Sequence, residues 1–475
     1  MKRIEHFLKL QREKTLLKFI TCGSVDDGKS TLIGRLLYDS QTVYQDQLET
    51  AKKESLKYGT KGEGIDFALL VDGLQSEKEQ GITIDVAYRF FSTEKKKYVI
   101  ADTPGHEQYT RNMVTGASNA DVAVILIDST KGVLTQTRRH AFLVSLLGIK
   151  NIVVAVNKMD LSNYSQKRFD LIKKDFSLMF EKLIYALPYR HNDVTVKFIP
   201  ISALHGENVV YGSKNMRWYD KETLIEYLDA LKIEKEHSHF RFDVQYVNRA
   251  YDGYRGYCGT VLGDSISSES EITIYPERKN AKISSIIEPK ADDSLPADSK
   301  TASPQRSVTL LLDRELDISR GALFVKSEDL QPTVSDSFEA MLVWMDEEPL
   351  KKRDYFLKIY SCEASCEIAQ IFYKQDVNSW EKSKGDTLRL NDIARVKVEV
   401  DRKIAFDLYE SCKRTGAFIM IDKITNNTVA AGMIVDTAST ETKRSKKYSE
   451  AEIALNRFIR EHYPEWGCKE IKESL

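Results

Sequence analysis

The sequence predicts an α/β domain with a mostly parallel sheet covered by helices, followed by two small β-barrels and a C-terminal helical tail. Three observations lead to this fold. Two nearly continuous apolar runs, residues 122–127 and 152–156, alternate with helical or polar sequence, as strands buried on both faces of a parallel sheet do. From residue 239 onward, short alternating strands separated by turn residues are typical of barrels. A capping box at residues 449–452 begins a final helix.

Composition is that of an ordinary globular protein with several domains. The 475 residues exceed what one core usually holds, and no apolar run reaches the roughly 18 residues of a membrane span. The net charge is -1, so no bulk field attracts nucleic acid, and we expect no nucleic-acid partner. The cysteines are scattered without any C-x-x-C pair, which favours reduced thiols in a cytoplasmic protein. Cys362 and Cys366 could be metal ligands, but buried strand thiols are the favoured interpretation.

Shifts in composition divide the chain into four parts. We predict a nucleotide-binding domain over residues 1–235, a first barrel over 239–330, a second barrel over 336–435, and a basic linker with a C-terminal helix over 440–475. The Ser-, Asp- and Pro-rich stretch 291–306 is expected to be an exposed loop.

A phosphate-binding loop follows the first apolar run. Residues 23–30 match the pattern G-x-x-x-x-G-K-[ST], with a predicted strand before and a predicted helix after, which argues against a chance turn. Backbone N–H groups of such a loop point at phosphate oxygens. Lys29 is expected to contact the β- and γ-phosphates, and the Ser30 hydroxyl to bind Mg²⁺. The residues assigned to the phosphates are Gly23, Ser24, Val25, Asp26, Asp27, Gly28, Lys29, Ser30 and Thr31.

Two further segments are candidates for sensing the γ-phosphate. Thr83 ends a polar segment and is expected to place its hydroxyl on Mg²⁺ when that segment folds over the phosphate. Asp102 ends a predicted strand and is expected to hold the same ion, while the Gly105 N–H meets the γ-phosphate. His106 could orient the attacking water, with an ordinary surface histidine as the alternative. The residues assigned here are Asp102, Thr103, Pro104, Gly105 and His106.

Two motifs at the ends of later strands indicate that the base is guanine. Asp160 can accept hydrogen bonds from guanine N1–H and the exocyclic amine, which adenine cannot supply. Backbone N–H groups after a further strand can meet guanine O6. The residues assigned to the base are Asn157, Lys158, Met159, Asp160, Ser202, Ala203 and Leu204. Because every motif follows a predicted strand in this order, the first domain is predicted to be a P-loop GTPase domain that binds GTP and Mg²⁺.

These motifs resemble those of the translational GTPases, and most closely those of the sulfate adenylyltransferase subunit 1 family. The similar segments, which span nearly the whole chain, are residues 23–30, 72–85, 102–113, 136–140, 240–242, 244–249, 317–321, 415–418 and 465–468. Three features depart from the family pattern: residues 291–306 are longer, Ala322 stands where an aspartate is usual, and Lys78 replaces an arginine. They lie outside the nucleotide motifs.

The resemblance implies that two subunits divide the work. A small catalytic subunit that binds ATP would convert ATP and sulfate to adenylylsulfate and pyrophosphate, and GTP hydrolysis on this chain would drive that uphill step. Lys29, Thr83 and His106 would then carry out the hydrolysis. No kinase domain for adenylylsulfate follows residue 475, so we expect the separate rather than the fused form.

Two other classes of protein share parts of the pattern. A translation factor that delivers aminoacyl-tRNA has the same fold and motifs, but it usually carries histidines at the positions of Ser24 and Asp27, and this chain lacks net positive charge. A P-loop kinase is disfavoured because Asp160 selects guanine and no acceptor site is visible.

Overall fold

The computed structural model describes residues 14–40, 49, 67–71, 85–105, 109–188, 193–233, 239–250, 254–289, 297–437 and 450–463. The chain forms two compact units, Met1–Asp436 and Thr437–Leu475. The first unit contains one open sheet and two barrels, and the second contains one described helix.

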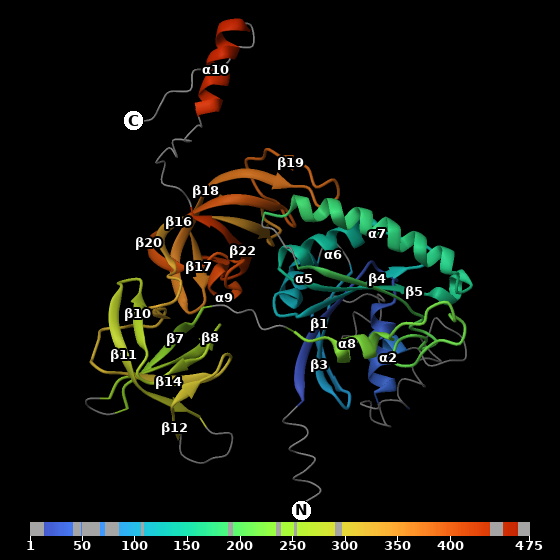
Figure 1. Cartoon of the computed structure of the whole chain (residues 1–475), viewed down its shortest axis with the longest axis horizontal. Coiled ribbons are helices and arrows are strands. Elements are labelled where there is room, and N and C mark those ends of the chain that lie inside the picture. The colour runs from blue at the N-terminus through green and yellow to red at the C-terminus, as the bar shows by residue number, and fades with distance from the viewer. Residues whose placement is uncertain are drawn as a thin grey trace, which may run out of the picture. The chain divides into compact units, whose positions relative to one another are not determined.

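The open sheet is mostly parallel, as the sequence predicts (Figure 1). Its strands are β1 (Thr15–Cys22), β2 (Ala87–Ser92), β3 (Lys96–Asp102), β4 (Val122–Asp128), β5 (Asn151–Asn157) and β6 (Thr195–Pro200). They lie in the order β2-β3-β1-β4-β5-β6, and β2 alone pairs antiparallel. Every residue of β4 is buried, because helices cover both faces of the central strands and an apolar run is needed on each.

Helices pack on both faces of this sheet and produce two apolar clusters. The helices are α2 (Lys29–Asp39), α5 (Thr110–Ala117), α6 (Thr135–Leu146), α7 (Gln166–Ala186) and α8 (Leu224–Ala230), with 3-10 turns at Phe67–Leu70 and Met159–Ser162. α2 and α8 contribute to one cluster, and α5, α6 and α7 to the other. The buried side of α7 comprises the residues at helical spacing in the sequence, including Phe169, Phe176 and Leu183, which confirms the prediction of a core-facing helix.

The first barrel is a ring of six strands with one strand added at its edge. Its strands are β7 (Arg241–Asn248), β8 (Gly256–Leu262), β10 (Glu271–Tyr275), β11 (Lys279–Glu288), β12 (Ala297–Ser299), β14 (Ser307–Leu312) and β15 (Leu323–Lys326). They run in the order β10-β15-β7-β8-β14-β11, the β10–β11 pairing closes the ring, and β12 extends β11. A separate pair is formed by β9 (Ile266–Ser267) and β13 (Thr301–Ala302).

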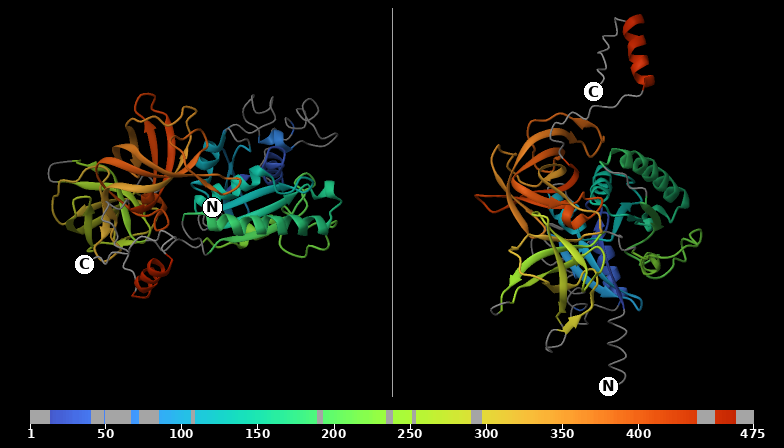
Figure 2. Two further views of the ribbon diagram at one scale, coloured as in Figure 1. Left: turned by 90° about the horizontal axis from the view of Figure 1, so that it is seen from above. Right: turned by 60° about the vertical axis from the view of Figure 1, so that its left-hand side comes forward.

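The second barrel closes in the same way. Its strands are β16 (Thr333–Trp344), β17 (Tyr355–Ile359), β18 (Cys362–Gln375), β19 (Lys382–Ser383), β20 (Ile393–Phe406), β21 (Ala417–Asp422) and β22 (Thr428–Thr437), with a short helix α9 (Lys413–Gly416). The ring is β17-β21-β22-β16-β20-β18, closed by β17–β18, and β19 extends β18. Figure 2 shows each barrel closing on itself, the first in yellow-green and the second in orange.

Two expectations about the barrels have different outcomes. Residues 291–306 were expected to be a loop, but β12 and β13 lie within that range, because short alternating segments there find antiparallel partners in β11 and β9. Cys362 and Cys366 are both buried on β18, and burial raises the pKa of each thiol, which agrees with strand thiols.

The second unit contains the predicted tail helix, α10 (Glu450–His462). Its Leu455 and Phe458 are exposed. Within the part of the chain that the structure describes, no helix is both long and apolar enough to cross a membrane.

Candidate nucleotide site

The predicted site residues that the structure describes follow the carboxyl ends of four parallel strands. β1 leads into residues 23–30, β3 ends at Asp102, β5 ends at Asn157, and β6 leads to Ser202. Because β3, β1, β4, β5 and β6 are neighbours in one parallel sheet, these ends share one edge. The fold therefore brings residues that are far apart in the sequence to one side of the domain.

The phosphate loop turns tightly between β1 and α2. Gly28 has φ 91°, a left-handed conformation that favours glycine, and a Cβ there would lie 2.5 Å from the Asn157 side-chain nitrogen. The loop is also closed by Ser24 and Asp27: the Asp27 N–H donates to the Ser24 carbonyl at 3.2 Å, and the Ser24 N–H donates to Asp27 Oδ2 at 2.6 Å. These two bonds between Ser24 and Asp27 define the shape of the loop.

Lys29 is held inside this loop. Its Nζ donates to the carbonyl oxygens of Gly23 at 2.9 Å and Ser24 at 3.0 Å, and the residue is only 7% exposed. Burial lowers the pKa of Lys29, and the nearby carboxylates of Asp102 and Asp27 oppose that shift. An ammonium group in this position is available to a phosphate that enters the loop.

Asp102 and Gly105 lie against the phosphate loop on the β3 side. Asp102 pairs with Thr21 in the β1–β3 register, and the Thr21 hydroxyl donates to Asp102 Oδ1 at 3.4 Å. A Cβ on Gly105 would lie 2.7 Å from the Gly23 carbonyl oxygen of the phosphate loop, and this backbone approach favours glycine. The Thr103 hydroxyl donates to the Thr21 carbonyl at 2.8 Å and fixes the strand end. The buried Asp102 carboxylate at the end of β3 and the Ser30 hydroxyl at the start of α2 are hard oxygen ligands of the kind that Mg²⁺ prefers.

Asn157 connects the phosphate loop to the base-recognition segment. Its amide nitrogen donates to the Asp27 carbonyl at 2.8 Å, and its amide oxygen accepts from the Ala203 N–H at 2.9 Å. Asn157 is 2% exposed, so both bonds are shielded from water. A side chain that the sequence assigns to the base therefore also fixes the loop that would hold the phosphates.

The base end of the site is arranged by hydrogen bonds between the two predicted motifs. The Ser202 hydroxyl donates to Asp160 Oδ1 at 2.6 Å, which holds the carboxylate in one orientation. The Met159 side chain is fully buried, and its N–H donates to the Ile201 carbonyl at 3.2 Å. The geometry brings Asn157, Asp160 and residues 202–204 together, as a guanine site requires.

Two supporting residues were missed by the sequence analysis. Asp128, which ends β4, accepts from Lys158 Nζ at 2.9 Å and fixes that lysine beside the base end. Arg35 on α2 donates through Nε to the Ala203 carbonyl at 3.3 Å, and through Nη2 to the Leu204 carbonyl. Asp128 comes directly after an apolar run, so its position at a strand end was the available signal. No local pattern in the sequence indicates the role of Arg35, because its partners are about 170 residues away in the chain.

Thr83 and His106 lie outside the described residues. Their assignments to Mg²⁺ and to the attacking water stay predictions. Val25 and Asp26 lie in the phosphate loop, Pro104 follows β3, and Thr31 lies in the first turn of α2.

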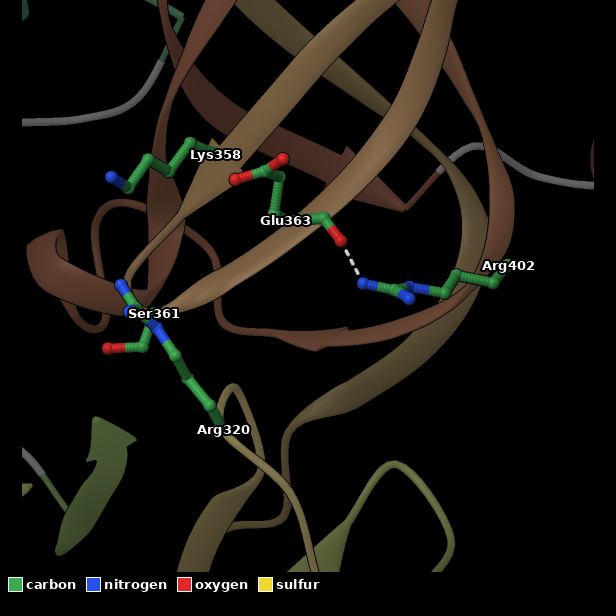
Figure 3. Close-up of a pocket in the computed structure, with 5 residues that line it drawn as sticks. All are labelled: Arg320, Lys358, Ser361, Glu363 and Arg402. Atoms are coloured by element: carbon green, nitrogen blue, oxygen red, sulfur yellow. Dashed lines mark hydrogen bonds between the residues drawn. The ribbon is translucent and has the colours of Figure 1, made fainter. Parts of the chain in front are cut away.

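A separate cavity of about 310 Å³ lies away from these loops (Figure 3). It is lined by Arg320, Lys358, Ser361, Glu363 and Arg402, and Arg402 donates to the Glu363 carbonyl. None of the predicted nucleotide residues lines it. The cavity is open and lined by charged groups, unlike the apolar pockets that usually hold small ligands.

Comparison with known families gives the class of protein. The model of the elongation factor Tu GTP binding domain matches residues 14–234, and the GTP-eEF1A C-terminal domain-like model matches residues 337–435. The first match covers the open sheet with its phosphate loop, and the second covers the second barrel. The fold, the loop and these matches define a GTPase of the translational type.

Individual relatives give the family. Sulfate adenylyltransferase subunit 1 of Aliarcobacter butzleri is 50% identical over 471 residues, covering 98% of this chain and 97% of that protein. The proteins of the same name from Sulfurovum sp. and Saccharophagus degradans are 50% and 46% identical, each covering at least 98% of both chains. The chain belongs to the sulfate adenylyltransferase subunit 1 family, which confirms the resemblance noted in the sequence.

Proposed function

We propose that this chain is the GTP-hydrolysing subunit of a cytoplasmic sulfate adenylyltransferase. GTP hydrolysis here would drive the formation of adenylylsulfate and pyrophosphate from ATP and sulfate on a small catalytic subunit that binds ATP. The observation that carries the proposal is the connection through Asn157, which joins the phosphate loop at Asp27 to the predicted base segment at Ala203, in a chain of this family. The four predicted parts, 1–235, 239–330, 336–435 and 440–475, are proposed as its domains.

The loops suggest a role for each group when GTP binds. When GTP binds, the Lys29 ammonium group would move from the carbonyls of Gly23 and Ser24 to the β- and γ-phosphates. Asp160 would accept from guanine, and the Ser202–Asp160 bond keeps it oriented for that contact. The Gly105 N–H would contact the γ-phosphate. Hydrolysis would remove this contact and so alter the conformation of the segment that follows β3.

Mg²⁺ fits the oxygen ligands at this edge of the sheet. Ser30, Asp102 and Thr83 would hold the ion together with the nucleotide phosphates, since Mg²⁺ is usually bound by few protein groups plus phosphate oxygens. When bound, the ion neutralises charge that develops on the phosphates during hydrolysis. His106 would orient the attacking water.

Copurification with the small subunit tests the proposal. Wild-type chain is expected to bind that subunit, and adenylylsulfate formation by the pair is expected to depend on GTP. A pair that forms adenylylsulfate equally well without GTP would contradict the coupling. Binding of aminoacyl-tRNA by this chain would instead favour a translation factor.

Two variants test the nucleotide site directly. Lys29→Ala is expected to abolish GTP binding, whereas Lys174→Ala, on the exposed side of α7, is expected to leave it unchanged. Asp160→Asn is expected to shift preference from GTP toward xanthosine triphosphate, because an amide can donate to the xanthine oxygen. Asp170→Asn, an exposed carboxylate on the same helix, is the matched control. Retained GTP affinity in Lys29→Ala, or unchanged selectivity in Asp160→Asn, would refute the assignment.

A further inference from the structure

The phosphate loop contains a buried carboxylate, Asp27, which the sequence analysis assigns to the phosphates together with the rest of the loop. Asp27 is 1% exposed and lies between the two glycines of the loop. Its Oδ2 accepts the Ser24 N–H at 2.6 Å, and its Oδ1 is buried with no hydrogen-bond partner among the residues that the structure describes. An isolated buried carboxylate oxygen is costly in its charged form.

The charged groups around Asp27 do not cancel its charge. The positive charge of Lys29 lowers the pKa of Asp27 by electrostatic attraction, while its ammonium group donates its hydrogen bonds to the carbonyls of Gly23 and Ser24. Asp128 at the end of β4 opposes Lys29, and Lys131 in the turn after β4 supports it. Burial outweighs the Ser24 hydrogen bond and these charges, and it raises the pKa of Asp27 to about 6.

Nucleotide phosphates would enter the loop close to this carboxylate. Two residues span at most about 7 Å, so Asp27 lies near Lys29, which must reach the phosphates. Salt screens buried charges only weakly. We propose that Asp27 weakens the binding of nucleotide phosphates by like-charge repulsion and thereby sets the rate at which bound nucleotide leaves. This inference rests on the proposed binding of GTP and adds a determinant of affinity within that site.

The repulsion gives nucleotide affinity a defined pH dependence. Bound phosphates stabilise the protonated form of Asp27, so its pKa in the complex lies above the value of about 6 in the free protein. Binding therefore takes up a proton in the interval between the two values. Affinity rises as the pH falls through this interval, and the effect ends below about pH 6, where Asp27 is neutral in both states.

Release of a fluorescent GDP analogue from the full chain, measured between pH 5 and pH 8, tests the proposal. Asp27→Asn keeps an oxygen that can accept from Ser24 and removes the charge. At pH 8 this variant is expected to bind the analogue roughly tenfold more tightly and to release it correspondingly more slowly. At pH 5 the two proteins are expected to differ by less than about twofold. Protonation of the nucleotide phosphates, with a pKa of about 6, affects both proteins equally and cancels in their ratio.

Asp121→Asn is the matched control. Asp121 is another carboxylate whose pKa burial raises, and it accepts from the Lys18 N–H at 2.9 Å. It precedes β4, at the end of the strand opposite the loop, so this variant is expected to keep the wild-type pH profile.

The experiment distinguishes two roles for Asp27: a charge that repels the phosphates, or a side chain that only stabilises the loop structure. The proposal would be overturned if the ratio of Asp27→Asn to wild-type affinity were the same at pH 5 and pH 8, or if Asp27→Asn bound more weakly at every pH. Loss of a purely structural side chain would weaken binding without changing its pH dependence. The proposed function is tested separately by binding of the small subunit. If wild-type protein binds the analogue but not that subunit, the proposed function fails and the role of Asp27 is still decided.

Discussion

The second barrel contacts the first barrel and the nucleotide-binding domain through two different surfaces. The contact between the barrels, called here the barrel interface, is charged and hydrogen-bonded. Arg241 of β7 donates to both oxygens of Asp407 in the second barrel at 2.8 and 2.9 Å, and the Thr415 hydroxyl of the same second barrel holds this carboxylate at 2.6 Å. The Ser361 hydroxyl donates to the buried Asp243 at 2.8 Å.

The contact with the nucleotide-binding domain, called here the helix interface, is mostly apolar. The buried cluster of α6 and its neighbours also contains the barrel residues Met341, Val343, Met345, Ile393 and Met433. Two hydrogen bonds also cross this interface: the Tyr409 hydroxyl donates to the Leu147 carbonyl at 3.0 Å, and Lys413 Nζ donates to the Gly148 carbonyl at 2.7 Å.

The difference between the barrel interface and the helix interface indicates which of the two contacts can shift. A buried bidentate ion pair is satisfied in only one geometry, so the barrel interface resists any change of angle. Apolar packing has no direction and can re-form after a small slide. Nucleotide-dependent motion is therefore expected at the helix interface, with the two barrels moving together.

Breaking the barrel interface is expected to have the largest effect. Asp407→Ala leaves the Arg241 guanidinium buried without its carboxylate, because Arg241 is 1% exposed. The free energy of unfolding is expected to fall by about 3 to 5 kcal/mol, measured by chemical denaturation. Glu269→Ala removes an exposed carboxylate that pairs with Lys282 in solvent and is expected to change little. A loss in Asp407→Ala no larger than in this control would contradict the rigid barrel interface.

Creating a cavity in the helix interface is expected to have a smaller effect. Met341→Ala is expected to cost about 2 kcal/mol, the low end for a buried methionine, because the two domains can close over the space. Hydrogen exchange should increase in α6 and β16 and stay unchanged in β7. Met341→Leu conserves volume and is the control. Faster exchange in β7 as well would show that the interfaces are not independent.

Acid is expected to weaken the nucleotide-binding domain through His140 of α6. Burial lowers the pKa of His140 to about 3, with Lys29 and Arg139 acting in the same direction. Because the unfolded chain takes up a proton near pH 6.5 and the folded chain does not, stability is present above pH 6.5 and is lost as pH falls toward 3. The loss from this group is about 1.4 kcal/mol per pH unit. His140→Gln should reduce the slope of unfolding free energy between pH 6 and pH 4 by about that amount; an unchanged slope would exclude His140 as the cause.

Removing one hydroxyl at the helix interface is expected to have the smallest effect. Tyr409→Phe loses the bond to the Leu147 carbonyl but keeps the buried ring, so the cost is about 1 kcal/mol. Thermal unfolding measures this change. Thr415→Val, at the barrel interface, loses a hydroxyl that donates to a carboxylate and should cost more. The reverse order would refute the contrast between the two interfaces.

Local patterns in the sequence predicted the fold well and the interfaces poorly. The apolar runs at 122–127 and 152–156 lie within β4 and β5, and the motif at 23–30 forms the turn after β1 and the start of α2, because these features depend on neighbours in sequence. The sequence did not predict that Arg241 pairs with Asp407, 166 residues later, because a charged residue in an alternating strand has no visible partner. The strand β22 of the second barrel was also missed, since its alternation is weak.

The sequence motifs named candidate site residues but gave no information on the hydrogen bonds that connect them. Motifs named Asn157 for the base, whereas its bonds to Asp27 and Ala203 depend on the order of strands in the sheet. The assignments of Thr83 and His106 stay predictions from the sequence.

The two bonds of the Asn157 amide have a kinetic consequence. They connect the phosphate loop and the segment after β6 through one buried side chain, so each loop restrains the other. A site restrained in this way does not pay for loop ordering at each encounter, and its association rate is then limited by diffusion and orientation. Variants of this site should therefore differ mainly in how long a nucleotide stays bound, and the residence time is the quantity that a partner subunit could read.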